Sequence, residues 1–273
     1  MGVCNVTPDS FSDGGLHFSL EQACAHVDQL LAEGADVIDI GGESTRPGAA
    51  AVPAKEQLAR VLEVVRYAAG PRGACVSIDT TSAEVAAACL DAGASVVNDV
   101  SCLRDAGEGG GLAKVVAAHG AAFVLMHARA TQSEMKGFSA WPDDAYGDVV
   151  KDVLDEWNAA AARAQALGVP RDALVMDPGL GFAKNARHST ELLRRTAEIV
   201  GALDVPVLIG ASRKSFLALA DKDAGPQDRI GASIAAALLA ARAGAAILRV
   251  HDVRATRQAI DLDRLVAPPR KEA

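Results

Sequence analysis

The chain alternates short apolar runs with longer amphipathic segments. The run that begins at Ala35 holds Val37, Ile38 and Ile40 without regular polar alternation, and Gly41 ends it. Such a run is typical of a parallel strand that is buried on both faces. Seven other runs are similar. The eight predicted strands span residues 1–6, 35–40, 74–79, 94–98, 121–126, 173–177, 205–210 and 245–250.

Helical patterns fill the segments between these runs. Residues 19–33 form one such pattern, which Gly34 ends, and residues 52–69 form the next, with Pro53 at its start. Short strands that alternate with helices pair in parallel through crossovers. About eight such units predict an α/β fold, a (β/α)8 TIM barrel with a single domain over residues 1–273. An open, doubly wound sheet is the alternative, and the C-terminal VAPPRKEA is expected to fray.

Composition and charge narrow the possible partners. The 273 residues are 50% hydrophobic but only 4% aromatic, so the core is expected to consist mainly of Ala, Val, Leu and Ile. A formal charge of -8 argues against nonspecific binding of nucleic acid or of an anionic membrane. We find no secretory leader and no apolar run that could span a bilayer, which predicts a soluble, cytoplasmic protein.

Five cysteines occur without a CxxC pair or metal-finger spacing, at positions 4, 24, 75, 89 and 102. Their neighbours are mostly apolar. Buried thiols in a reducing compartment are therefore expected.

Polar residues follow the predicted strands. Because the carboxyl ends of all barrel strands meet on one face, these residues are expected to converge around a pocket. A lone aspartate after a strand is often a helix cap, and Asp39 is open to that interpretation, whereas Asp79 precedes three other residues that could cap a helix. The strand-end residues are Asn5, Asp39, Asp79, Asn98, Asp99, His127, Asp177, Ser212, Arg213, Lys214, Arg249 and His251.

The loop after the second strand reads GGESTRPG. Arg46 offers a planar fork for an anion, Ser44 and Thr45 add hydroxyl donors, and the glycines allow a ligand to approach the backbone. An anion site is one interpretation, and a surface turn with a solvated arginine is the other.

Taken together, the motifs NVTPDSFSDGG, DIGGESTRPG, SIDT, NDVS, DPGLGFAKN, SRKS and RVHDV resemble the dihydropteroate synthase family, in this order and across nearly the whole chain. The resemblance implies an eight-stranded barrel that joins p-aminobenzoate to a hydroxymethyl-dihydropterin pyrophosphate and releases pyrophosphate. It also implies a homodimer, Mg²⁺ as cofactor, and inhibition by sulfonamides.

The resemblance assigns a pterin site to Asp79, Asn98, Met126, Asp177 and Lys214. A pterin presents a guanine-like edge of donors and acceptors, which carboxylate, amide and ammonium groups complement. Met126 would pack against the ring. Singly, Asn98 could be a satisfied buried amide and Lys214 a solvated residue. Asp79 and Asp177 would repel each other and raise one pKa unless Lys214 or the ligand intervened.

The family's pyrophosphate positions match Thr45, Arg46, Arg249 and His251, and its magnesium position matches Asn5. Two guanidiniums and an imidazole would offset the charge of the anion. Mg²⁺ keeps several waters and binds largely through substrate phosphates, so one amide oxygen from the protein is sufficient. We expect leaving-group stabilisation rather than a strong general base. The predicted catalytic residues are Arg46, Lys214, Arg249 and His251.

The family's p-aminobenzoate site matches Pro47, Phe182 and Ser215, beside Lys214. Phe182 would form an apolar wall, and Ser215 at a helix N-terminus would receive the carboxylate. The loops at 7–15 and 41–48 hold few bulky apolar residues, and ordering them costs entropy. We therefore expect p-aminobenzoate to bind after pyrophosphate and Mg²⁺.

Two features depart from the family pattern. After Met126 and His127 the family continues Met-Gln-Gly-x-Pro, whereas residues 128–141 here do not. The chain also begins within its first predicted strand. The alternatives are a pterin-binding methyltransferase that acts on a corrinoid, which would not need ESTRPG or SRKS, and a catalytically silent pterin-binding paralogue.

Overall fold

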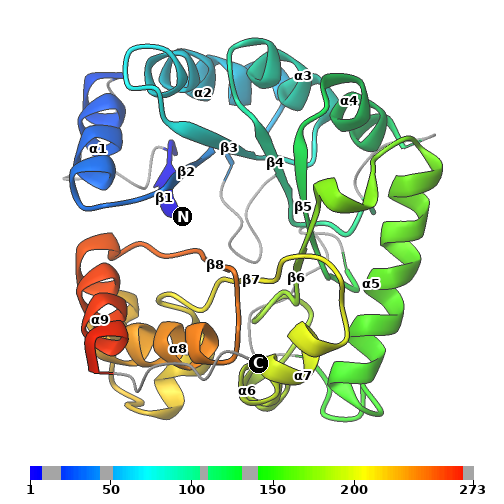
Figure 1. Ribbon diagram of the computed structural model, residues 1–273, viewed down its shortest axis with the longest axis vertical. Coiled ribbons are helices and arrows are strands. Elements are labelled where there is room, and N and C mark those ends of the chain that lie inside the picture. The colour runs from blue at the N-terminus through cyan, green and yellow to red at the C-terminus, as the bar shows by residue number, and fades with distance from the viewer. Residues whose placement is uncertain (8–19, 44–51, 105–109, 131–140, 267–273) are drawn as a thin grey trace.

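The computed structural model describes residues 1–7, 20–43, 52–104, 110–130 and 141–266. Within them, eight short parallel strands lie inside a ring of helices (Figure 1). The strands are β1 (Gly2–Asn5), β2 (Val37–Gly41), β3 (Cys75–Asp79), β4 (Val96–Asp99), β5 (Ala122–Met126), β6 (Leu174–Asp177), β7 (Leu208–Ile209) and β8 (Ile247–Leu248).

The strands form a closed barrel. β1 to β6 pair in sequence order as one parallel sheet, and β7 pairs with β8. Parallel bridges join Met176 to Val207 and Gly2 to Val250, so both gaps between the two sheets are spanned. The Val3 N–H donates to the Val250 carbonyl at 3.0 Å across the second gap. The TIM barrel is confirmed, and the open doubly wound sheet is excluded.

The helices of the ring follow the strands in order. Ser82 caps α3 by accepting from the Val85 N–H, and Asp148 caps α5, so the helices begin where short polar side chains satisfy free backbone donors. The helices are α1 (Leu20–Ala32), α2 (Ala54–Ala69), α3 (Ala83–Asp91), α4 (Gly111–His119), α5 (Val149–Ala166), α6 (Ala186–Arg194), α7 (Thr196–Gly201), α8 (Ile230–Arg242) and α9 (Val253–Val266), with short 3-10 helices η3 (Arg171–Ala173), η4 (Ser215–Leu219) and η5 (Pro226–Arg229).

The main core lies between the strands and the helix ring and consists mostly of Val, Leu, Ile and Ala. Trp157 of α5 is fully buried, and its indole N–H donates to the Leu125 carbonyl at 2.8 Å. A smaller cluster of Val124, Val175 and Leu208 packs together from three neighbouring strands. The barrel is thus a packed core, and a ligand must bind at one of its ends.

The predicted strands all exist, but β7 and β8 are only two residues long, whereas six were predicted for each. Their flanking residues pair through single bridges or bonds instead of a continuous ladder. The expectation of buried thiols is wrong for Cys75, which is exposed, and for Cys24, which is half-buried. All five cysteines are free. No helix in the described residues is long and apolar enough to cross a membrane.

The register of the strands places the polar residues at the same height along the barrel axis, at the carboxyl ends of the strands. Asn5 lies opposite Gly41, Gly41 opposite Asp79, and Asp79 opposite Asn98. On the other side of the barrel, the last residue of β6, Asp177, lies opposite Met126. The predicted convergence at the carboxyl ends of the strands is therefore present.

Candidate active site

An ion-paired cluster lies at the carboxyl end of the barrel. Arg249 donates from Nε to Oδ2 of Asp39 at 2.6 Å and from Nη2 to Oδ2 of Asp79 at 2.8 Å. Asn98 donates from Nδ2 to the same Asp39 oxygen at 3.3 Å. The helix-cap interpretation of Asp39 is wrong, because this residue lies within β2 with a fully buried side chain and serves as a partner of Arg249.

Electrostatics differ between the members of this cluster. Burial raises the pKa of Asp79 to about 7, although Arg249 acts in the opposite direction. The carboxylate of Asp39 adds to this increase, as do those of Asp99 and Glu43. The predicted repulsion between Asp79 and Asp177 is thus not the cause, because the strongest like-charge neighbour of Asp79 is Asp39. Burial acts to lower the pKa of Arg249, but Asp39 and Asp79 outweigh it and raise this pKa above its usual value.

Asp177 and Lys214 face each other across Gly210. A Cβ built at Gly210 would lie 3.9 Å from both Asp177 Oδ2 and Lys214 Nζ, and 3.8 Å from the Cβ of Arg249. The other carboxylate oxygen of Asp177 accepts from the Gly179 N–H at 2.7 Å. Burial raises the pKa of Asp177 and lowers that of Lys214 to about 8, and each charge partly opposes the shift of the other. Lys214 is therefore not a solvated surface residue.

An apolar wall adjoins these groups. Met126 and Phe182 belong to one buried cluster with Ala128, Ala130 and Ala183. The ammonium of Lys214 lies 4.7 Å from the centroid of the Phe182 ring and donates to the Leu180 carbonyl at 2.5 Å. A flat ring would find a charged edge and an apolar face in the same place.

His251 contacts Ser212, whose hydroxyl lies 3.0 Å from Nδ1 and accepts from the His251 N–H at 3.2 Å. Burial, with Arg249 and Arg213 nearby, lowers the pKa of His251 to about 3. The surroundings of His251 thus favour a neutral ring, and the expectation that this imidazole offsets the charge of an anion stays a prediction. A neutral ring can still donate a hydrogen bond to an anion.

Other predicted residues are only partly in view. Thr45, Arg46 and Pro47 lie outside the described residues, as does most of the loop at 7–15. Ser215 begins η4, so it lies at a helix N-terminus as expected, but η4 is a 3-10 helix of only five residues. A Cβ at Gly41 would lie 3.6 Å from Asn5 Oδ1 and 3.4 Å from the Cβ of Asp79, which places Asn5 beside the cluster.

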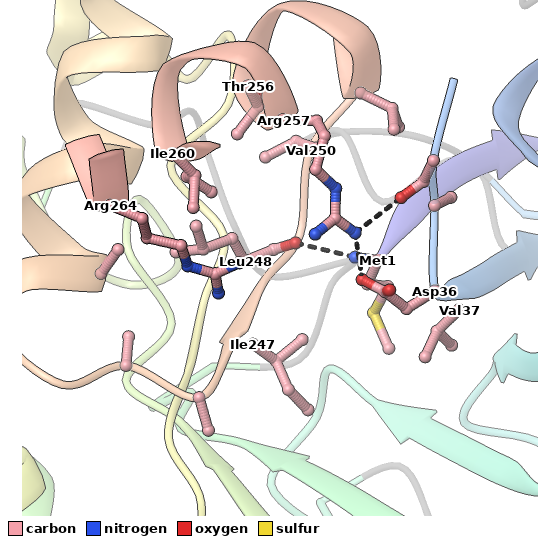
Figure 2. A pocket seen from close by; sticks show the side chains of 16 residues that line it. Met1, Asp36, Val37, Ile247, Leu248, Val250, Thr256, Arg257, Ile260 and Arg264 are labelled. Carbon is pink, nitrogen blue, oxygen red and sulfur yellow. Dashed lines mark hydrogen bonds and ion pairs between the residues drawn. The ribbon is translucent and has the colours of Figure 1, made fainter. Parts of the chain in front are cut away.

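A cavity of about 370 Å³ lies at the opposite end of the barrel, near the starts of β2 and β8 (Figure 2). The charged groups that line this cavity already have partners within the protein. Arg257 donates to Asp36 at 2.6 Å, and the Met1 ammonium donates to the Leu248 carbonyl at 3.0 Å. None of the predicted site residues that the structure describes lines it.

Comparisons with known proteins agree with this geometry. The model of the family described as pterin binding enzyme matches residues 1–251. The dihydropteroate synthase of Mycobacterium leprae is 45% identical over 267 residues, which cover 95% of this chain and 90% of that protein. The chain belongs to the dihydropteroate synthase family. It is accordingly a transferase.

Solved structures of dihydropteroate synthases show the same fold. That of Yersinia pestis, in complex with a sulfonamide drug, has a TM-score of 0.87 and 39% identity, and the match covers 97% of this chain and 92% of that one. That of Xanthomonas albilineans, in complex with 7,8-dihydropteroate, has a TM-score of 0.83 and 37% identity, with 98% and 93% covered.

Sequence reasoning missed two features of this site. Asp39 was indistinguishable from a cap, because its partner Arg249 lies 210 positions away. Lys184 was not singled out, although it is only 1% exposed and its ammonium contacts the His127 and Phe182 carbonyls. A lysine that follows the largely apolar run from Pro178 to Ala183 was the one available signal.

Proposed function

We propose that this chain joins p-aminobenzoate to 6-hydroxymethyl-7,8-dihydropterin pyrophosphate, giving 7,8-dihydropteroate and pyrophosphate in folate biosynthesis. The observation that carries this proposal is the position of Asp177, Lys214 and Arg249 around Gly210, beside the wall formed by Met126 and Phe182. A carboxylate, an ammonium and an apolar face together suit a pterin. The Xanthomonas relative in complex with 7,8-dihydropteroate supports this choice of ligand.

In this proposal the pterin ring lies between the apolar wall and the polar groups. Asp177 accepts from the N–H donors of the ring, while Lys214 donates to its acceptors. Asn98 and Asp79 complete the polar edge. Both are buried, so their hydrogen bonds to a ligand are formed away from competing water.

We assign the pyrophosphate to the mouth of the barrel, which is the opening at the carboxyl ends of the strands, next to Arg249 and His251. Arg249 supplies a permanent charge, and the neutral His251 supplies a ring N–H. We further propose that Thr45 and Arg46 take part, on the basis of the family motif that they match. The guanidinium of Arg249 is already oriented by two carboxylates, so less side-chain entropy is lost when an anion binds.

The donor set near the mouth fits Mg²⁺ bound mainly through phosphate oxygens and water. The described residues hold no cluster of three or more His, Cys, Asp or Glu that could hold a metal ion, and Asp79 and Asp39 already pair with Arg249. Asn5 is left as an oxygen donor. Mg²⁺ held there would neutralise charge on the departing pyrophosphate.

The residues then favour departure of the leaving group followed by attack of the amine. The bond between the pterin methylene carbon and the pyrophosphate oxygen breaks, and Arg249 and His251 stabilise the leaving anion. Positive charge on the methylene carbon is delocalised into the ring that Asp177 and Lys214 hold. The aniline nitrogen forms the new C–N bond and loses a proton to solvent.

We assign p-aminobenzoate to the side of the site that holds Phe182, Ser215 and Pro47. Phe182 offers an apolar surface, and Ser215 directly follows Lys214. Sulfonamides are expected to compete for this position, in line with the drug complex of the Yersinia relative. A noncompetitive pattern against p-aminobenzoate would place the drug elsewhere.

The experiment is a direct assay. Purified protein is mixed with the dihydropterin pyrophosphate, p-aminobenzoate and Mg²⁺, and dihydropteroate and pyrophosphate are both quantified. Equimolar formation of the two products is expected. Pterin binding without product would favour the catalytically silent paralogue, and methyl transfer from a methylated folate to a corrinoid would favour the methyltransferase.

We also propose that the chain acts as a cytoplasmic homodimer with one barrel domain per subunit. Five free cysteines suit a reducing compartment. Helices α8 and α9 lie side by side (Figure 1). Both carry exposed apolar side chains, including Leu239 at 57% and Leu262 at 60%. Exposed apolar patches mark interaction surfaces. Sedimentation velocity that gave the mass of a single chain at micromolar concentration would contradict the dimer.

A further inference from the structure

Lys184 is a buried lysine in the segment that follows Asp177, and burial lowers its pKa to about 7, although Asp177 acts in the opposite direction. Its side chain is among the largest that are fully buried in the described residues, and its ammonium lies 3.0 Å from the Phe182 carbonyl and 3.3 Å from the His127 carbonyl. It also lies 2.9 Å from Nδ1 of His127. No salt-bridge partner lies within 4 Å of it in the described part of the chain. Its three protein partners are thus neutral groups.

The contact with His127 determines which ring nitrogen carries the proton. An ammonium only donates, and below its pKa of about 7 Lys184 is charged, so Nδ1 of His127 accepts and the proton of the neutral ring lies on Nε2. That nitrogen lies 3.0 Å from the Glu156 carboxylate, which also accepts from Arg129 at 2.9 Å. His127 therefore links the buried ammonium to a carboxylate on α5. Burial and Lys184 keep the pKa of His127 low, at about 3, which agrees with a neutral ring.

The loop from Asp177 to Phe182 is packed closely onto these groups. A Cβ at Gly179, whose φ is +67°, would lie 2.1 Å from the His127 carbonyl oxygen and 3.3 Å from the ammonium of Lys184. Only glycine fits at this position. Lys214 also bonds to this loop, at the Leu180 carbonyl. Two lysines therefore hold the loop, but only Lys214 is proposed to touch a ligand.

We propose that Lys184 is a positioning residue whose buried ammonium fixes the loop from Asp177 to Phe182 against the end of β5 and supports the charged form of Asp177 for the pterin. This role rests on the proposed function, in which Asp177 binds the pterin. Lys184 affects the bound pterin through Asp177 and Phe182 and does not touch the ligand itself.

The role has a consequence for pH. Burial raises the pKa of Asp177, and the groups that oppose this rise are Lys214, the Gly179 N–H, Arg249 and Lys184. Removing the charge of Lys184 therefore raises the pKa of Asp177 further. A protonated Asp177 accepts fewer hydrogen bonds, so pterin affinity falls as pH is lowered. In such a variant this fall should begin at a higher pH than in the parent.

The test is the pH dependence of binding of 6-hydroxymethylpterin, measured by calorimetry from pH 5 to 9. Lys184→Met removes the charge at similar length, and Lys184→Arg retains a charge. We expect the acid limb of Lys184→Met, the part of the profile where affinity falls as pH is lowered, to move to higher pH by about half a unit or more. On that limb Lys184→Met should bind the pterin about threefold more weakly, or worse, than the parent does. Lys184→Arg should keep the parental limb. Binding of Mg²⁺-pyrophosphate should be unchanged in both variants.

Tyr146→Phe is the matched control. The Tyr146 hydroxyl donates to the Ala183 carbonyl at 2.9 Å, so its loss loosens the same loop without removing a charge. Its acid limb should stay parental. A Lys184→Met variant with weaker binding but an unmoved limb would overturn the proposed role, because a purely structural contact behaves in that way.

A second measurement needs no variant. In the parent protein, ¹⁵N chemical shifts of His127 near pH 6, where Lys184 is charged and the ring is neutral, should show a proton on Nε2 and none on Nδ1. The opposite tautomer would also overturn the role of Lys184. Asp177→Asn separates this outcome from failure of the proposed function. If it leaves pterin binding intact, the pterin site itself is wrong, and if it weakens binding while Lys184→Met does not, only the positioning role fails.

Discussion

Arg249, just after β8, donates from Nε to the buried carboxylate of Asp39 in β2, at 2.6 Å and across 210 positions of the chain. Its Nη2 donates to Asp79 of β3. The guanidinium of Arg249 therefore links the end of β8 to β2 and β3. The two carboxylates fix its orientation without an anion. Oδ1 of Asp39 has no hydrogen-bond partner in the described residues, so this carboxylate depends on Arg249 and Asn98.

Asp39→Asn is expected to lower the free energy of unfolding by about 1 to 3 kcal/mol, because a buried charged partner of Arg249 is lost while Asp79 remains. Denaturant unfolding measures this. Asp36→Asn is the control, since Asp36 forms a largely exposed ion pair with Arg257 and should cost less than about 1 kcal/mol. Equal losses in the two variants would contradict the importance of the buried pair.

Asp79 should make stability depend on pH. Its pKa of about 7 in the folded protein lies above the value near 4 that it has in the unfolded chain. Between pH 4 and pH 7, Asp79 is therefore protonated in the native state and ionised in the unfolded state. The contribution of Asp79 to the free energy of unfolding thus falls as pH rises from about 4 to 7. The stability of Asp79→Asn relative to the parent should increase across this window and then level off. A constant difference from pH 4 to 8 would show that Asp79 is ionised throughout.

Asp177→Asn should weaken pterin binding by more than about 1 kcal/mol, because a carboxylate that accepts from ring donors becomes a neutral amide. Calorimetry at pH 7 measures the change. Asp172→Asn, at an exposed aspartate of η3 just ahead of β6, serves as the control and should bind as the parent does. Equal affinities in all three proteins would remove Asp177 from the site.

Turnover should require Mg²⁺. With few protein oxygens free near Asn5, the metal is expected to bind with the pyrophosphate and to be removed easily by a chelator. Excess EDTA should abolish product formation, and added Mg²⁺ should restore it. The thermal stability of the ligand-free protein should not change. Full turnover in EDTA would exclude a metal-bound leaving group.

p-Aminobenzoate should bind the free protein much more weakly than the protein with pterin, Mg²⁺ and pyrophosphate. The sequences at 7–15 and 41–48 hold few large apolar side chains, and fixing each residue costs roughly 1 to 2 kcal/mol of backbone entropy. The contacts of a small ring do not compensate for this cost, whereas a multiply charged anion with its metal can. Comparable affinities in two titrations, with and without these ligands, would indicate a preformed site.

The sequence alone determined the order of strands and helices and most of the polar residues at the strand ends. These features are local. Buried parallel strands show as continuous apolar runs, helices show their own period, and the residue that ends each strand is read directly from the chain. Asp177, Lys214 and Asn98 are therefore identifiable from the sequence, and their common face follows from the topology of a parallel barrel.

Only the tertiary structure decided which charges meet and which groups are ionised. The pairing of Asp39 with Arg249, the neutral state of His251 and the burial of Lys184 depend on distances between residues far apart in sequence and on the loss of water around them. Neither these distances nor the loss of water leaves a periodic pattern or a motif in the sequence. The energy of a charge in a protein is determined by the groups that fold around it, and those groups come from segments that are far apart in the sequence.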